Sequence, residues 1–187
     1  MVDNGGQWTH REWRVLRYIG VRTRIVPNTT PIEELEADGL VLSGGAPRVG
    51  LQPDLLGKCS DYLDSGEIPI LAICVGLQFM ALYFDGQVGA SVSPEFGRTE
   101  IEVIDEDTIL RGLPGTFVAW ESHNDHVTVL PEGFRSIARS ENCDVQALCH
   151  DSRPWFGTQF HPEVEQTEHG YDIFKNYTEF VREFRRA

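Results

Sequence analysis

The stretch Ile70-Leu71-Ala72-Ile73-Cys74-Val75-Gly76-Leu77-Gln78 decides the fold. The apolar run Ile68–Ile73 is typical of a strand that is buried on both faces, and Val75–Phe84 has the pattern of a helix. A strand that runs directly into a helix indicates a parallel α/β sheet. Cys74 stands at the junction, where the positive end of a helix favours thiolate over thiol. A buried structural cysteine would fit the same pattern.

Outward from this stretch, the first half of the chain alternates strand-like and helical segments. We expect helices at Trp8–Ile19 and Asp54–Leu63, and short strands at Val21–Val26 and Gly39–Leu42. A first strand of about three residues precedes the turn Asn4-Gly5-Gly6, below the usual ~5–6 residues. The alternation predicts an open, doubly wound, mostly parallel α/β sheet with helices on both faces.

The second half of the chain changes to closely spaced strand candidates separated by Pro, Gly, Asp and Asn. They are Thr99–Ile104, Thr116–Trp120, Val127–Leu130, Phe134–Ser140, Val145–Cys149 and Trp155–Phe160. This spacing predicts antiparallel strands added to the parallel sheet. A last helix at about Tyr171–Arg185 closes the chain. Because no linker or repeat interrupts the pattern, we expect a single domain over residues 1–187.

The composition excludes several classes of function. The 187 residues carry a formal net charge of −13, and 41% of them are hydrophobic. Nucleic acids and anionic membranes require a cationic surface, so neither is an expected partner. No segment reaches the ~18 apolar residues of a membrane span, and no secretory signal is visible. The four cysteines do not have the spacing of a disulfide framework or a zinc site. We expect a soluble cytoplasmic protein with reduced thiols.

The segment Phe160-His161-Pro162-Glu163 supplies a candidate base for a cysteine nucleophile. Residues two apart in extended backbone point to the same side, so His161 and Glu163 share a face. A carboxylate beside an imidazole fixes its tautomer and stabilises the imidazolium that forms during catalysis. A surface loop would also fit so short a pattern.

The segment Ser43-Gly44-Gly45-Ala46-Pro47 directly follows a predicted strand. Glycines there let backbone N–H groups approach a ligand closely, as an oxyanion hole requires, and an ordinary tight turn is the alternative. No Gly-Lys-Ser/Thr follows, which argues against a phosphate loop. His123 and His126 resemble a metal pair, but no third ligand has suitable spacing, so we expect no metal site.

The order of these motifs carries more weight than any one of them. The Gly-rich turn, Cys74 and the His161–Glu163 pair each follow a predicted strand. Open α/β sheets place their sites outside the carboxyl ends of strands. Together the motifs predict covalent acyl transfer through a cysteine nucleophile.

These residues resemble the class I, triad-type glutamine amidotransferases over essentially the whole chain. The family elbow Gly-x-Cys-x-Gly-x-Gln is similar to Ala72–Gln78, and the family's His-Pro-Glu and Gly-Gly turn are matched by His161-Pro162-Glu163 and Gly44-Gly45. Ala72 replaces the first glycine of the elbow and would strain it if that position required a positive φ. Leu77 replaces a frequent histidine, and we expect it to pack the helix.

The resemblance implies a role for each matched residue. Cys74, His161 and Glu163 would form the catalytic triad. The backbone N–H groups of Gly45 and Val75 would form the oxyanion hole. Three further matched positions would line the glutamine pocket, the last two largely through their backbone: Gln78, Ser122 and His123.

Within the family, Asp3–Arg11, Trp120–Asp125 and His161–Val164 are similar to the archaeal-type stand-alone glutaminase subunits of GMP synthase. This resemblance implies glutamine hydrolysis without a cofactor or metal in this chain. It also implies a separate synthetase subunit, in a heterodimer or larger assembly, that uses Mg-ATP and the released ammonia to convert xanthosine monophosphate to GMP. The turn Ser43–Arg48 lacks the Asp and Ser of the synthetase loop Ser-Gly-Gly-x-Asp-Ser.

Other functions are compatible with the same motifs. One is a glutaminase subunit of anthranilate or aminodeoxychorismate synthase. Another is a catalytically silent regulatory subunit, although the triad is intact. A third is a different Cys-His hydrolase on the same fold, such as a γ-glutamyl peptidase.

Charge is unevenly distributed along the chain. The first 24 residues hold five arginines against Asp3 and Glu12, an excess of three positive charges: Arg11, Arg14, Arg17, Arg22 and Arg24. We predict that this basic segment helps to bind the synthetase, with a solvated helix face as the alternative.

Overall fold

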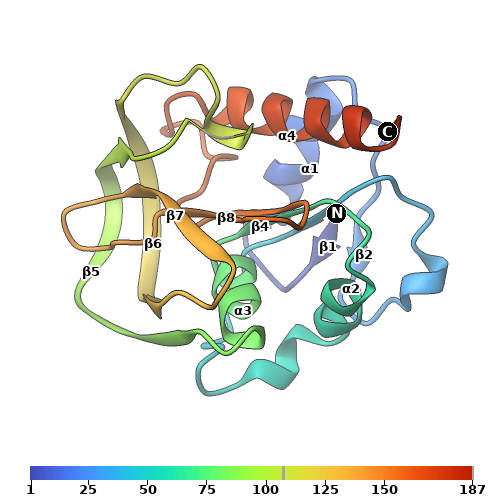
Figure 1. Ribbon diagram of the computed structural model, residues 1–187, viewed down its shortest axis with the longest axis horizontal. Helices are drawn as coiled ribbons and strands as arrows, with labels where there is room; N and C mark the ends of the chain where they lie inside the picture. The colour runs from blue at the N-terminus through green and yellow to red at the C-terminus, as the bar shows by residue number, and fades with distance from the viewer. Residues whose placement is uncertain (107, 187) are drawn as a thin grey trace.

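One sheet of nine strands runs through the part of the chain that the computed structural model describes, residues 1–106 and 108–186 (Figure 1). Its order is β2-β1-β3-β4-β9-β8-β7-β5-β6. The parallel strands are β1 (Val2–Asp3), β2 (Val26–Pro27), β3 (Leu40–Leu42), β4 (Ile70–Ile73) and β9 (Trp155–Thr158). The antiparallel continuation comprises β5 (Gln87–Val103), β6 (Thr116–Val129), β7 (Phe134–Arg139) and β8 (Ala147–His150).

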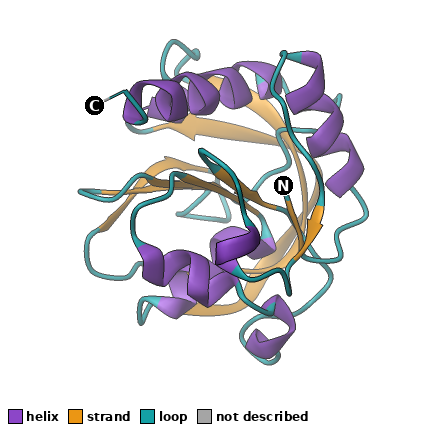
Figure 2. Cartoon of the chain, turned by 90° about the vertical axis from the view of Figure 1, so that its right-hand side faces the viewer, coloured by secondary structure: helices purple, strands orange, loops and turns teal. Residues whose placement is uncertain are grey.

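Helices cover both faces of the sheet (Figures 1 and 2). The helices are α1 (Thr9–Tyr18), α2 (Cys59–Ser65), α3 (Val75–Tyr83) and α4 (Gly170–Phe184). Leu71 and Ile73 of β4 belong to the core beneath α1 and α4, whereas Ile70 and Ala72 belong to the core beneath α2 and α3. Successive side chains of a strand point to opposite faces, so this continuous apolar run joins two cores. The predicted doubly wound α/β class with antiparallel additions is confirmed.

Two predicted segments differ from the observed elements. The strand expected at Val21–Val26 is limited to Val26–Pro27, because β2 pairs with β1 alone and β1 offers only two residues. The helix expected over Asp54–Leu63 is interrupted at Gly57, which has a φ of +56° and ends a short 3₁₀ turn over Pro53–Leu56 before α2 begins.

The long β5–β6 ribbon is only partly predicted by the sequence. The expected strand Thr99–Ile104 is the end of β5, and the two expected strands Thr116–Trp120 and Val127–Leu130 are parts of the continuous β6. Side chains at odd positions of β6 are buried from Phe117 to Val127, while those at even positions are more exposed. The polar residues at the centre of β6 have the composition of a loop, so the sequence does not reveal the alternation of buried and exposed side chains there. The other predicted helices and strands agree with the structure to within two residues at each end.

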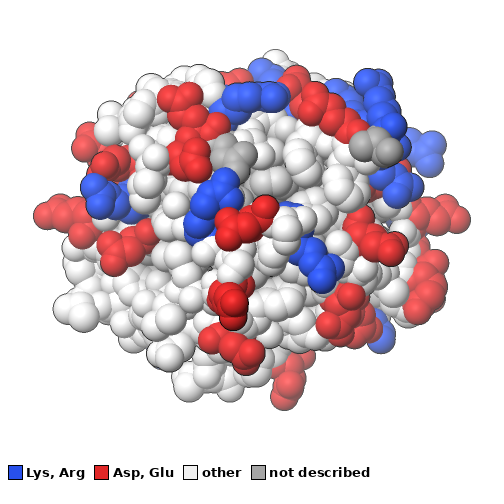
Figure 3. Space-filling view, in the orientation of Figure 1, with Lys and Arg blue, Asp and Glu red and all other residues white. Residues whose placement is uncertain are grey.

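Three further expectations concern membrane spans, the cysteines and the charge of the surface. No helix among the described residues is both long and apolar enough to cross a membrane. All four cysteines are buried, and none forms a disulfide within the described chain. On the face shown in Figure 3, acidic side chains are spread over the surface with basic side chains between them. That face therefore presents no continuous basic surface of the kind that binds nucleic acid.

Candidate active site

Cys74 occupies a strained turn between β4 and α3. Its φ is +51°, a region that few residues other than glycine adopt. The Cys74 N–H donates to the Thr158 carbonyl at 2.7 Å, and its carbonyl accepts the Gln78 N–H at 3.0 Å. Cys74 is 6% exposed and lines a cavity of about 270 Å³. The turn therefore presents the thiol to a cavity at the carboxyl edge of the parallel strands, as predicted.

The two substitutions in the elbow pattern are accommodated. Ala72 lies within β4 opposite Gly157, and the positive φ falls at Cys74 instead, so the strain expected at Ala72 does not arise. Leu77 is fully buried in α3, where it contacts Gly157. Its expected packing role is confirmed.

His161 and Glu163 meet as expected, but in a turn rather than in the extended backbone on which the expectation relied, since the Val164 N–H donates to the His161 carbonyl at 3.3 Å. His161 Nδ1 lies 2.8 Å from Glu163 Oε1, and the Trp8 ring packs edge-to-face with the imidazole, with centroids 4.4 Å apart. Burial alone would lower the pKa of His161. The carboxylate of Glu163 and the charge and hydrogen bond of Cys74 outweigh burial and raise this pKa well above its ordinary value. The imidazole is thus adjacent to Cys74 and favours the protonated form.

The predicted oxyanion-hole donors are neighbours. A Cβ on Gly45 would lie 2.5 Å from the Asn4 carbonyl oxygen and 3.1 Å from Val75 Cγ1, so only glycine fits here. Val75 is the first residue of α3, and its N–H therefore has no partner inside the helix. Gly45 and Cys74 line the same cavity.

The three predicted pocket residues separate into two groups. Ser122 lines the cavity, whereas Gln78 and His123 lie behind its wall and are buried. Gln78 Nε2 donates to the Asp125 carbonyl at 2.7 Å, and His123 Nδ1 lies 3.1 Å from the same oxygen. The Gln78 amide makes these internal contacts and is not part of the cavity lining, so its role in binding glutamine stays a prediction. Gln78 and His123 instead support the wall that Ser122 presents.

A family model for class-I glutamine amidotransferases matches residues 1–180 of the sequence. The chain belongs to the class I glutamine amidotransferase family. The match extends from β1 through most of α4, so it includes every residue of the site described above.

Curated relatives of this amidotransferase cover nearly its whole length. A glutamine-hydrolysing GMP synthase subunit of Thermoplasma acidophilum is 50% identical over 186 residues, covering 99% of this chain and 93% of the relative. The GMP synthase subunit of the same type from Thermococcus kodakarensis is 48% identical and covers 98% of each chain.

Solved structures agree with the fold. The crystal structure of a Thermoplasma acidophilum protein described as a GMP synthase subunit has a TM-score of 0.94 at 50% identity, covering 99% of this chain and 94% of that one. A glutamine amidotransferase of Thermotoga maritima has a TM-score of 0.70 at 22% identity, covering 92% of this chain and 76% of that one. The second likeness supports the fold alone.

The sequence motifs of the amidotransferase do not reveal Gln159. Its side chain is fully buried, its Nε2 lies 3.6 Å from Cys74 Sγ, and its Oε1 accepts a hydrogen bond from Gln78 at 3.0 Å. Gln159 directly follows β9, and its neighbours on both sides are buried as well, so no local pattern distinguishes it.

A buried group of metal-ligating residue types is likewise hidden in the sequence. Glu95 and Glu121 meet His123, with His123 Nε2 3.1 Å from Glu95 Oε2 and 3.4 Å from Glu121 Oε2. No third ligand was expected beside His123 and His126; a register shift in β5 places Glu95 opposite His123, while His126 is not part of the group, and the expectation of no metal site stays a prediction. Burial, followed by the neighbouring Glu95, raises the pKa of Glu121 well above its ordinary value. These groups therefore favour a protonated Glu121.

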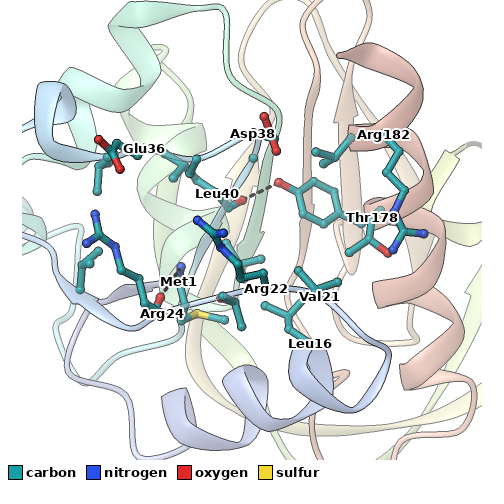
Figure 4. A pocket seen from close by; sticks show the side chains of 18 of the residues that line it. Met1, Leu16, Val21, Arg22, Arg24, Glu36, Asp38, Leu40, Thr178 and Arg182 are labelled. Atoms are coloured by element: carbon teal, nitrogen blue, oxygen red, sulfur yellow. Dashed lines mark hydrogen bonds between the residues drawn. The ribbon is translucent and has the colours of Figure 1, made fainter. Parts of the chain in front are cut away.

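A second and larger cavity has a volume of about 600 Å³ and a different set of lining residues; Figure 4 shows it from close by. Its lining includes Leu16, Val21 and Leu40, with Arg22 and Arg182 among the charged side chains around it. None of the triad, oxyanion-hole or pocket residues lines it. Cavity size alone would therefore select the wrong region of this amidotransferase, and the chemistry of the lining identifies the smaller one.

Proposed function

We propose that this chain is the glutaminase subunit of a two-subunit GMP synthase. It hydrolyses glutamine to glutamate and ammonia. The observation that carries the proposal is the placement of His161 between its hydrogen-bond partners Cys74 and Glu163, with His161 Nδ1 2.8 Å from Glu163 Oε1. The names of the curated relatives support the assignment to GMP synthesis.

Acylation begins with the Cys74 thiolate. The sulfur attacks the carbon of the glutamine side-chain amide, and the carbonyl oxygen becomes an oxyanion held by the N–H groups of Gly45 and Val75. His161 donates its proton to the nitrogen as the C–N bond breaks, so ammonia leaves and a glutamyl thioester remains. Glu163 keeps the imidazole in the required orientation and stabilises its cationic form.

Deacylation uses the same groups in reverse. His161, now neutral, accepts a proton from water as that water attacks the thioester carbon. The second oxyanion forms in the same hole and collapses to glutamate and the Cys74 thiolate. We propose that this half-reaction needs no cofactor or metal.

A separate synthetase subunit would use the ammonia. It would activate xanthosine monophosphate with Mg-ATP and form GMP, in a heterodimer or larger assembly. The Gly44-Gly45 turn of this chain faces Cys74 rather than a nucleotide, since an added Cβ at Gly44 would lie 3.7 Å from Cys74 Cβ. Ammonia becomes ammonium in water, so the synthetase must cover the edge of the sheet that carries Cys74.

The first turns of α1 are the part of the basic segment best placed for this contact. α1 begins beside Trp8, which packs on His161, and Arg11 and Arg14 are exposed on the same helix. Arg22 and Arg24 instead line the second cavity, whose lining does not include Cys74 (Figure 4). We propose that the arginines of α1, rather than the whole segment, contact the synthetase. Charge reversal at Arg11 and Arg14 that leaves synthetase affinity unchanged would refute this docking site.

We also propose a cytoplasmic location, where reduced thiols persist. Four buried cysteines without a disulfide suit that environment.

The deciding experiment is reaction with an electrophilic glutamine analogue in the presence of the synthetase and its nucleotides, followed by peptide mass mapping. We expect a single modified residue, Cys74, and loss of glutamine-dependent GMP formation. Modification elsewhere, with activity lost, would overturn the nucleophile assignment. Activation by an anthranilate or aminodeoxychorismate synthase partner, and not by the GMP synthetase, would redirect the pathway assignment.

A further inference from the structure

Glu12 is a buried carboxyl group in the wall of the active-site cavity. It lies in the first turn of α1, is 1% exposed, and lines the cavity that holds Cys74 and His161. By sequence, Glu12 belongs among the surface charges of a basic segment. The structure places it inside, and its Oε2 has no hydrogen-bond partner among the described residues. A buried carboxyl group in this position calls for a role.

The other carboxyl oxygen contacts the oxyanion turn. Glu12 Oε1 accepts the N–H of Gly44 at 3.3 Å. The preceding residue, Ser43, is fixed from the opposite side by Asn4, whose N–H donates to Ser43 Oγ at 2.9 Å and whose amide donates to the Ser43 carbonyl at 3.0 Å. The peptide between Ser43 and Gly44 is therefore held at both ends.

The position of Gly44 matters to the catalytic pair. A Cβ on Gly44 would lie 3.2 Å from His161 Cε1 and 3.7 Å from Cys74 Cβ. A small movement of this peptide would therefore change both the imidazole contact and the direction of the next N–H group, that of Gly45.

We infer that Glu12 is a positioning residue, whose carboxyl group holds the Gly44 N–H so that the Gly45 N–H faces the reacting carbonyl of glutamine. This inference rests on the proposed function of the Gly44-Gly45 turn. The two neighbouring backbone N–H groups then have different roles, because the Gly44 N–H is occupied by Glu12 and the Gly45 N–H remains for substrate.

The charge of Glu12 agrees with this role. Burial, and next the carboxylate of Glu163, raise the pKa of Glu12 well above its ordinary value, while His161 and the Gly44 N–H act in the opposite direction. Cys74 and the Met1 ammonium are the other titratable groups that interact with it. A protonated Glu12 still accepts the Gly44 N–H and adds no second negative charge beside the Cys74 thiolate.

Two variants of Glu12 test the inference. Glu12→Gln keeps the acceptor oxygen and mimics the neutral carboxyl group, whereas Glu12→Met keeps the approximate length and removes the acceptor. In the assembled enzyme we expect Glu12→Gln to retain kcat for glutamine within about threefold, and Glu12→Met to lose ~10–100-fold with little change in KM.

Alkylation of Cys74 by iodoacetamide separates positioning from general damage. This substitution forms a C–S bond and releases iodide without an oxyanion, so it requires a reactive thiolate but no oxyanion hole. We expect both variants to alkylate Cys74 at about the rate of the unmodified protein. Loss of alkylation together with kcat in Glu12→Met would show a role in the thiolate or in folding and overturn the inference.

Two further outcomes would also overturn it. One is a Glu12→Met protein with unchanged kcat, and the other is a Glu12→Gln protein as inactive as Glu12→Met, which would show that the ionised carboxylate itself is required. Failure of the proposed function is distinguishable, since Cys74→Ala would then retain glutamine hydrolysis whatever stands at position 12.

Discussion

Replacement of Gly45 by alanine tests the oxyanion hole directly. An added Cβ would lie 2.5 Å from the Asn4 carbonyl oxygen, and real Cβ atoms keep at least 3.0 Å from such an atom, so the turn must move by about 0.5 Å or more. The obstacle is backbone, which cannot rotate away as a side chain would. The movement displaces the Gly45 N–H from the developing oxyanion.

The expected loss follows from the energetics of oxyanion donors. Removal of one donor costs ~10²–10³ in kcat, or roughly 2.7–4 kcal/mol, and we expect Gly45→Ala to fall near the lower value because the Val75 donor remains. The KM for glutamine should change little, since the interaction strengthens only in the transition state.

The assay is glutamate release by the assembled enzyme, with ammonia-dependent GMP formation measured in parallel. Ammonia-dependent synthesis should be unchanged. Gly115→Ala is the matched control, because an added Cβ there meets nothing within 4 Å. A Gly45→Ala protein that melts like the control and retains kcat within about threefold of it would refute the assigned role of this turn.

Three further predictions concern the nucleophile Cys74, the core residue Tyr177 and the buried carboxyl group of Glu121. Cys74→Ala should abolish glutamine-dependent GMP formation and leave ammonia-dependent formation intact; loss of both would indicate a structural role. Tyr177→Phe should lower the free energy of unfolding by about 1–3 kcal/mol in urea denaturation, because the Tyr177 hydroxyl donates to the buried carbonyls of Leu40 at 2.7 Å and Pro69 at 2.9 Å; an unchanged midpoint would contradict that contribution. The pKa of Glu121 is raised in the folded state, so the folded protein keeps a proton that the unfolded chain releases. The contribution of Glu121 to the free energy of unfolding therefore falls as pH rises from its unfolded-state pKa through its folded-state pKa. Glutamine cannot titrate, so the free energy of unfolding of Glu121→Gln, measured relative to that of the unmodified protein, should increase with pH. Curves of unfolding free energy against pH that run parallel for the two proteins would contradict a protonated Glu121.

The parts of the fold that are predictable depend on local sequence. The run from Ile70 to Cys74 combines continuous apolar character with an immediate change to helical periodicity, and neither signal requires knowledge of the rest of the chain. The interruption at Gly57 is less visible, because the apolar spacing on either side of it still matches one helix. In the structure its backbone approaches Asn28, and only tertiary contact reveals that constraint.

In the site, too, some residues are recognisable from local sequence and others only from tertiary contacts. Cys74, His161 and Glu163 are recognisable because each stands in a short motif. Glu12 and Glu95 carry no local signal, since one lies within an amphipathic helix and the other in an irregular strand. Their importance arises from contacts with Gly44 and His123, which lie 32 and 28 positions away along the chain. Long-range pairing of this kind cannot be read from periodicity.

The alternation along β6 has a consequence for how this enzyme can change. Ser122 lines the cavity that holds Cys74, while its neighbours Glu121 and His123 point into the buried interior. The wall of the substrate site is thus one strand thick, and adjacent codons specify opposite sides of it. Substitutions at Ser122 should therefore change the lining of the cavity at little risk to folding, whereas substitutions at the buried neighbours Glu121 and His123 should chiefly lower stability.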